Sequence, residues 1–152
     1  MLPLVIASFV LFGGSVHAAD ATRVRTEIQP LLNELLLAAN VHDTDRFLAS
    51  YLRDQSLVLV FDGEITMGWD DVRALQLKWW NNGKSDVAYS KNGKSKFTIL
   101  GPKAVVVTDP MVSLRKLSDG RVSRDEFVVT MVWEKRSEGW RIVQVHESTL
   151  RK

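Results

Sequence analysis

The spacing of apolar residues changes once along this chain, and the change limits the folds open to it. Before residue 80, apolar side chains recur every three or four positions in three segments, the period of a helix that buries one face. From residue 86 to residue 148 they fill five shorter segments separated by glycine-containing turns, as strands do. Helices followed by a run of strands predict an α+β domain with the helices packed on one face of an antiparallel sheet.

Each predicted helix has a recognisable start or stop signal. Thr26 and Gln29 have the spacing of a capping box, so the first helix is expected to begin there. The pair Asp43-Thr44 supplies a cap for the second helix. The third is expected to open at residues 68–71 and to stop at residues 81–83, Asn-Asn-Gly.

One apolar strand is expected between the second and third helices. Leu57–Phe61 is a continuous apolar run, which is typical of a strand covered on both faces. Asp62-Gly63 follows it and predicts a tight turn. The later strands are predicted at residues 86–90, 97–100, 104–114, 123–134 and 140–148.

The beginning of the chain has the pattern of an export signal. Residues 1–19 contain no Lys, Arg, Asp or Glu, and Leu2–Phe12 is almost entirely apolar. Small residues follow, so we expect a signal peptide over residues 1–19, cleaved after Ala18 or Ala19, and a mature domain over residues 20–152. The apolar run is shorter than the roughly 20 residues that span a bilayer, so no membrane association is expected after cleavage. The alternative is a buried helix that begins the domain.

Composition excludes several classes of function. Lys and Arg number 20 against 18 Asp and Glu, so the net charge of +2 gives no case for nucleic acid. Cysteine is absent, which excludes disulfides and thiolate chemistry, and in an exported protein favours the periplasm or secretion. The sequence has no phosphate loop, nucleotide fingerprint or zinc spacing, so we expect neither cofactor nor metal.

Several short motifs, in order, resemble those of SnoaL-like members of the nuclear-transport-factor-two-like superfamily. They lie at His42–Phe47, Val60–Glu64, Gly68–Arg73, Thr130–Trp133 and Gly139–Ser148. The resemblance covers nearly the whole mature chain. It implies three helices packed on a strongly curved antiparallel sheet, a cone-shaped α+β barrel with a pocket between helices and sheet. The superfamily includes isomerases, cyclases, dehydratases, hydrolases and non-catalytic assembly domains, so the fold does not choose a function.

Alternation along the strands predicts which residues face that pocket. On the last strand, Glu147 continues the inward apolar set. The predicted lining is Leu35, Tyr51, Leu57, Leu59, Phe61, Leu75, Trp79, Val129, Met131, Trp133, Val143, Val145 and Glu147. The alternative is a filled core without a cavity.

Resemblance to ketosteroid isomerases allows a sharper comparison. Those enzymes use a tyrosine and two aspartates, and a gapless alignment places their positions at about Leu35, Leu59 and Met131. Leucine and methionine neither abstract a proton nor hold an oxyanion. The steroid-isomerase type of catalysis is therefore not expected, and whether the chain is an enzyme stays open.

Four residues remain as candidates for chemistry. Glu147 ends an apolar stripe, where burial would raise its pKa. Asp109 precedes a proline inside an apolar strand, which predicts a bulge or an edge position; turn chemistry is the favoured interpretation. Tyr51 and His146 are candidate donors, although alternation places His146 on the outer face. Four lysines, Lys84, Lys91, Lys94 and Lys96, are expected in a solvated loop.

These patterns favour a protein that holds a small, mostly apolar molecule. A homodimer is expected through the outer sheet face, at Val128, Thr130, Val132 and Ile142. One alternative is a lyase, isomerase or hydrolase with Glu147 or Asp109 as general base. The other is an assembly module with no ligand and a collapsed pocket.

Overall fold

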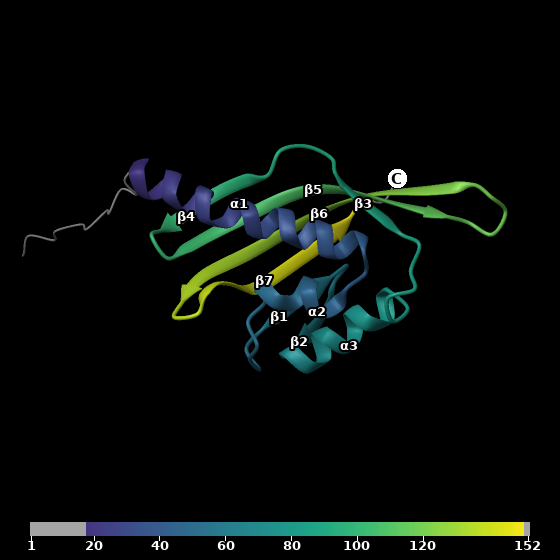
Figure 1. The fold of residues 1–152 in the computed structure, drawn as a ribbon, viewed down its shortest axis with the longest axis horizontal. Coiled ribbons are helices and arrows are strands. Elements are labelled where there is room, and N and C mark those ends of the chain that lie inside the picture. The colour runs from purple at the N-terminus through teal and green to yellow at the C-terminus, as the bar shows by residue number, and fades with distance from the viewer. Residues whose placement is uncertain (1–17, 151–152) are drawn as a thin grey trace, which may run out of the picture.

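The computed structural model describes residues 18–150, which form three helices and seven strands (Figure 1). The predicted signal peptide lies outside the described residues, except that Ala18 and Ala19 begin the first helix. The helices are α1 (Ala18–Asn40), α2 (Thr44–Phe47), extended by a 3-10 turn at Leu48–Ser50, and α3 (Trp69–Trp79). The strands are β1 (Val58–Phe61), β2 (Glu64–Met67), β3 (Ala88–Lys91), β4 (Lys96–Gly101), β5 (Ala104–Lys116), β6 (Val122–Arg136) and β7 (Gly139–Thr149).

The seven strands form one curved sheet with the helices on its concave face (Figure 1). The strand order is β2-β1-β7-β6-β5-β3, and β4 also pairs with β5. The predicted α+β class is confirmed, but two details differ. Strand β1 runs parallel to β7, so the sheet is mixed, and it does not close into a barrel. These two strands are joined through most of the chain, so no short hairpin forces them to be antiparallel.

Helix α1 begins before the position that the local signal indicates. Thr26 is not a cap; its hydroxyl donates to the carbonyl of Thr22 at 3.0 Å inside the helix. The predicted helix start is therefore wrong. Val24 and Ile28 are fully buried in line with Leu32, so the apolar stripe begins before Thr26 and packing extends the helix.

The other helix signals act as expected. The Asp43 carboxylate accepts from the backbone N–H of Arg46 at 3.0 Å and caps α2. Residues 81–83 all have positive φ and end α3. The turn at Asp62-Gly63 also has positive φ at both residues and joins β1 to β2 in a hairpin.

Pro110 does not produce a bulge in β5. The register with β6 continues through it, with Asp109 opposite Val129 and Pro110 opposite Val128. On the other side of β5, the pairing with β3 ends at Met111 and that with β4 begins at Thr108. The missing N–H of proline thus falls at a gap between two partner strands, where the ladder needs no donor.

A register shift between β6 and β7 changes which residues of β7 face inward. Val132 pairs with Gln144 but Trp133 pairs with Ile142, so Val143 is the extra residue. Ile142 is consequently fully buried in the core, not on the outer face as expected. Val143 is only half-buried, not inward as alternation predicted.

The core fills one end of the space between sheet and helices. Val24 and Ile28, in the first half of α1, belong to the same buried cluster as Trp133 and Trp140. The interior under the second half of α1 contains a cavity instead. Within residues 18–150, no helix is long and apolar enough to cross a membrane.

Candidate functional site

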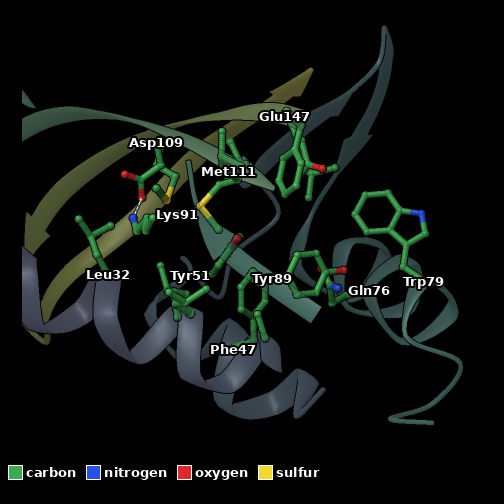
Figure 2. Close-up of a pocket in the computed structure, with 18 of the residues that line it drawn as sticks. Leu32, Phe47, Tyr51, Gln76, Trp79, Tyr89, Lys91, Asp109, Met111 and Glu147 are labelled. Carbon is green, nitrogen blue, oxygen red and sulfur yellow. Dashed lines mark hydrogen bonds and ion pairs between the residues drawn. The ribbon is translucent and has the colours of Figure 1, made fainter. Parts of the chain in front are cut away.

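The cavity lies between the second half of α1, helix α3 and the concave face of the sheet (Figure 2). The cavity and the solvent-open space at its mouth together measure about 860 Å³. Most of its lining is aliphatic or aromatic, contributed by Leu32, Leu35, Leu36, Ala39, Phe47, Leu59, Trp79, Trp80, Met111, Phe127, Val129, Met131 and Val145. Polar groups enter at six residues: Tyr51, Gln76, Tyr89, Lys91, Asp109 and Glu147. Apolar cavities with a few polar groups are the usual form of small-molecule sites.

Two of the polar residues occupy one row across the sheet. Asp109 on β5 pairs with Val129 on β6, and Val129 pairs with Glu147 on β7. Residues that pair directly project from the same face of a sheet. Both carboxyl-bearing residues therefore point into the cavity, with Val129 between them.

Glu147 is the carboxyl that the cavity perturbs most. Its side chain has no hydrogen bond or ion pair with any residue in the described part of the chain, while its backbone carbonyl accepts from Asp62 N–H at 3.2 Å. Burial raises the pKa of Glu147 to about 7, and the negative charge of Asp62 adds to the shift. At neutral pH this carboxyl therefore exists both with and without its proton.

Asp109 has a partner that the sequence interpretation assigned elsewhere. Its side chain is 5% exposed and forms an ion pair with Lys91, whose ammonium also donates to Ser95 Oγ at 3.3 Å. The second oxygen of Asp109, Oδ1, is buried and has no hydrogen-bond partner in the described part of the chain. Lys91 was expected in a solvated loop, and that expectation is wrong: it is the last residue of β3 and lines the cavity.

Two tyrosines bring hydroxyl groups to the cavity. Tyr51 is buried, and burial, followed by the charge of Glu147, raises its pKa. Burial also raises the pKa of Tyr89, whose hydroxyl accepts a hydrogen bond from Trp80 Nε1 at 3.0 Å. Since that bond uses Tyr89 as an acceptor, the hydroxyl proton stays available for a ligand.

Among the described residues that line the cavity, Gln76 is the other buried polar one, on the inner face of α3 (Figure 2). Its amide has no hydrogen bond with any residue between 18 and 150, although buried polar groups are usually paired. The amide provides both a donor and an acceptor at the α3 side of the cavity.

The structure brings most of the predicted pocket residues together. Those that line the cavity are Leu35, Tyr51, Leu59, Trp79, Val129, Met131, Val145 and Glu147. The three positions compared with ketosteroid isomerases, Leu35, Leu59 and Met131, are thus apolar groups of the cavity wall.

Five predicted lining residues lie elsewhere. Leu57 and Trp133 are fully buried in the packed core. Phe61 and Leu75 pack against that core, and Phe61 lies behind Trp79, with 4.9 Å between ring centroids. Val143 is displaced by the register shift in β7.

The candidate donor His146 is exposed on the outer face, because Val145 and Glu147 on either side of it point inward. It does not reach the cavity. No group of three or more His, Asp or Glu able to hold a metal ion occurs among residues 18–150.

Sequence reasoning missed the contribution of β3. Tyr89 and Lys91 project from the same face of that strand, but the strand was predicted to end at residue 90. Extending the strand by one residue would have added Lys91, on the same face as Tyr89. Gln76 was missed because a single polar residue on an apolar helix face has no distinguishing pattern.

The architecture, three helices on the concave face of an open mixed sheet with a cavity between them, defines the nuclear-transport-factor-two-like fold. Residues 28–152 match the model of the SnoaL-like domain, and the chain belongs to this family. No curated protein matches the chain.

Solved structures agree with this assignment of the fold. A nuclear-transport-factor-two-like protein of unknown function from Shewanella oneidensis is 24% identical, with 82% of this chain and 98% of that chain covered and a TM-score of 0.67. A protein of the same kind with a cystatin-like fold from Novosphingobium aromaticivorans is 19% identical, with 87% of each chain covered and a TM-score of 0.71. A ketosteroid isomerase-like protein from Erwinia carotovora is 19% identical, with coverage of 84% and 96% and a TM-score of 0.65.

Proposed function

We propose that the protein binds a small, mostly apolar molecule in this cavity and that Glu147 makes a polar contact with it. The observation that carries the proposal is a carboxyl in a largely apolar cavity that has no hydrogen-bond or ion-pair partner among residues 18–150. A buried polar group without a partner is unfavourable, so a ligand that pairs with Glu147 recovers free energy in addition to burying its own apolar surface.

The geometry supports binding over the alternative of a ligand-free assembly module. Such a module needs no interior space, and filling the cavity with larger side chains would stabilise it. Instead, the unpaired Gln76 amide and the Tyr51 hydroxyl share the cavity with Glu147. None of these three groups has a hydrogen-bond partner among residues 18–150, so each is available to pair with a ligand.

Native mass spectrometry of the protein, purified gently from its own host, tests the proposal. We expect a discrete small-molecule adduct whose mass is lost when the sample is heated or extracted with solvent. A protein that carries no adduct and takes up no neutral apolar compound would contradict binding.

A second candidate is an acid–base enzyme, favoured by one observation. A carboxyl whose pKa is about 7 exchanges protons efficiently at neutral pH, and the Tyr51 hydroxyl shares the cavity with it. Glu147 would be the general base of a lyase, isomerase or hydrolase. Asp109 is less suited because Lys91 already neutralises it.

The Glu147→Gln variant distinguishes the two candidates once a ligand is identified. Glutamine keeps the shape and hydrogen-bonding capacity of the side chain but does not take up a proton. Loss of turnover with retained binding would establish the enzyme. A change in affinity alone, with no reaction in either protein, would support the binding function.

A further inference from the structure

We propose that the ligand has a neutral polar group at each end of an apolar body: Glu147 binds one group and the Lys91–Asp109 pair binds the other. This inference rests on the proposed function and deepens it. The ligand class is an elongated, uncharged molecule with a hydroxyl or carbonyl oxygen at both ends.

The two polar ends are separated by the width of the sheet between them. Asp109, Val129 and Glu147 are direct partners on three adjacent strands. Neighbouring strands lie about 4.8 Å apart, so the Cα atoms of Asp109 and Glu147 are roughly 10 Å apart. Figure 2 shows the ion pair and Glu147 on either side of Met111.

At the Lys91 end, the ammonium group is the part available to a ligand. The Lys91 side chain is 26% exposed, whereas that of Asp109 is 5% exposed. An ammonium has three N–H groups, and the contacts with Asp109 and Ser95 use two of them. The third has no acceptor among residues 18–150. Because Asp109 already neutralises the charge, a neutral oxygen fits this position better than an anion.

Stability alone does not explain this ion pair. Burying two charges removes their hydration, and the attraction between them rarely gives a large net gain. Here the loss of hydration is also incompletely compensated, since Asp109 Oδ1 is buried with no hydrogen-bond partner among the described residues. A pair that keeps one buried oxygen without a partner and lies in the cavity wall is well placed to recognise a ligand.

Between the two ends, the cavity wall is apolar. Val129 separates the two carboxyl-bearing residues within their row, and Met111, Met131 and Val145 surround it on the sheet. Leu35 of α1 closes the cavity from the helix side. Along the sheet, the middle of the ligand therefore meets apolar side chains, while Tyr51, Gln76 and Tyr89 line other parts of the cavity. The apolar stretch of sheet defines the body between the two polar ends.

Displacement of a bound probe tests the inference. The full chain would be loaded with the neutral fluorescent probe N-phenylnaphthylamine and titrated with octanol or with the octanediol that has a hydroxyl at each end. If the second hydroxyl of the diol is buried without a hydrogen-bond partner, the affinity of the diol should be about tenfold lower than that of octanol, or more. We expect the diol to displace the probe at the same concentration as octanol or lower, because both of its ends find partners.

The double variant Lys91→Met, Asp109→Leu removes the pair without leaving an unpaired charge. In this variant we expect displacement of the probe to require a diol concentration at least about tenfold higher than that of octanol. Octanol itself should displace the probe at the same concentration as in the wild type. Lys94→Met, at an exposed turn residue outside the cavity, is the matched control and should behave as the wild type.

Comparing octanol with the diol on the wild type tests the two-ended ligand even if the double variant does not fold. A diol that is about tenfold weaker than octanol in the wild type would overturn the two-ended ligand and leave the binding function intact. A probe that does not bind at all would overturn the proposed function and this inference together.

Discussion

Burial moves the pKa of Glu147 to a value close to neutral pH. Its carboxyl ordinarily ionises near pH 4.5, and burial with the nearby charge of Asp62 raises its pKa to about 7. Between these two values the folded protein keeps a proton that the unfolded chain has already lost. The free energy of unfolding must therefore fall as the pH rises through this window.

The Glu147→Gln variant should remove that pH dependence. A pKa difference of this size lowers the free energy of unfolding by about 3 kcal/mol, and the full loss is reached above pH 7. Urea unfolding at about pH 5 and about pH 8 measures it: the wild type should lose stability at the higher pH and the variant should not. Glu64→Gln, at an exposed position on β2, should keep the wild-type behaviour. Equal pH dependence in wild type and Glu147→Gln would contradict the assignment.

At the scale of elements, Asn40 couples the end of α1 to strand β3. Its side-chain amide donates to the carbonyl of Tyr89 at 2.9 Å, and its side-chain oxygen accepts from the N–H of Tyr89 at 2.8 Å. The amide thus pairs with an edge strand as a short strand would. It also holds Tyr89, whose hydroxyl enters the cavity.

Replacing Asn40 with alanine should loosen this junction. The loss of two hydrogen bonds that bridge helix and sheet is expected to lower the free energy of unfolding by about 1–2 kcal/mol, measured in urea. Asn33→Ala is the control on the same helix, because Asn33 only accepts from Gln29 on the exposed side. Equal stability losses in the two variants would show that Asn40 does not join α1 to β3.

Local signals predicted some elements well, and non-local pairing explains the failures. The Asp43 cap, the Asp62-Gly63 turn and the stop at residues 81–83 depend on a few adjacent residues, and each was predicted correctly. The bulge at Val143 and the parallel pairing of β1 with β7 depend on a partner strand distant in sequence. No pattern within either segment encodes them.

The candidate site was likewise predicted where the strands follow a regular pattern and missed where it depends on distant partners. Strict alternation correctly placed Val129, Met131 and Glu147 along one face, because β6 and β7 keep a regular register there. It failed at Val143, where the register shifts. The Lys91–Asp109 pair joins residues on two strands, so their contact emerges only from the fold.

At the scale of the whole molecule, the outer face of the sheet is not covered by any described helix (Figure 1). Val58, Val106 and Val132 lie in one row across it, with Gln144 between Val58 and Val132, and the adjacent strand β2 adds Met67, which is 57% exposed. We propose that a second copy covers this face around a two-fold axis, which would bury the same residues on both subunits.

Light scattering on a sizing column checks the proposed dimer. The wild type should have twice the monomer mass, and Val132→Lys should be monomeric, because a charge in the centre of the interface loses its water. Leu37→Lys, at an exposed position on α1, should remain dimeric. A monomeric wild type would contradict the proposal.

We also propose export, from the uncharged apolar pattern of the first nineteen residues. Expressed in a bacterium as the full chain, the protein should be found outside the cytoplasm, and its measured mass should match a mature chain that begins at Ala19 or Asp20. An intact chain in the cytoplasm would instead indicate that these residues belong to the domain.

Binding of a small apolar molecule in the cavity under α1 requires that the cavity be open, and a pair of tryptophan substitutions tests this. Val129 lines the cavity, while the adjacent Val128 points to the outer face. Titration with N-phenylnaphthylamine should show saturable binding to the wild type and to Val128→Trp. Val129→Trp, which fills the cavity, should retain the circular dichroism of the wild type and lose binding. Equal binding by both tryptophan variants, or no binding by the wild type, would contradict binding of an apolar molecule in this cavity.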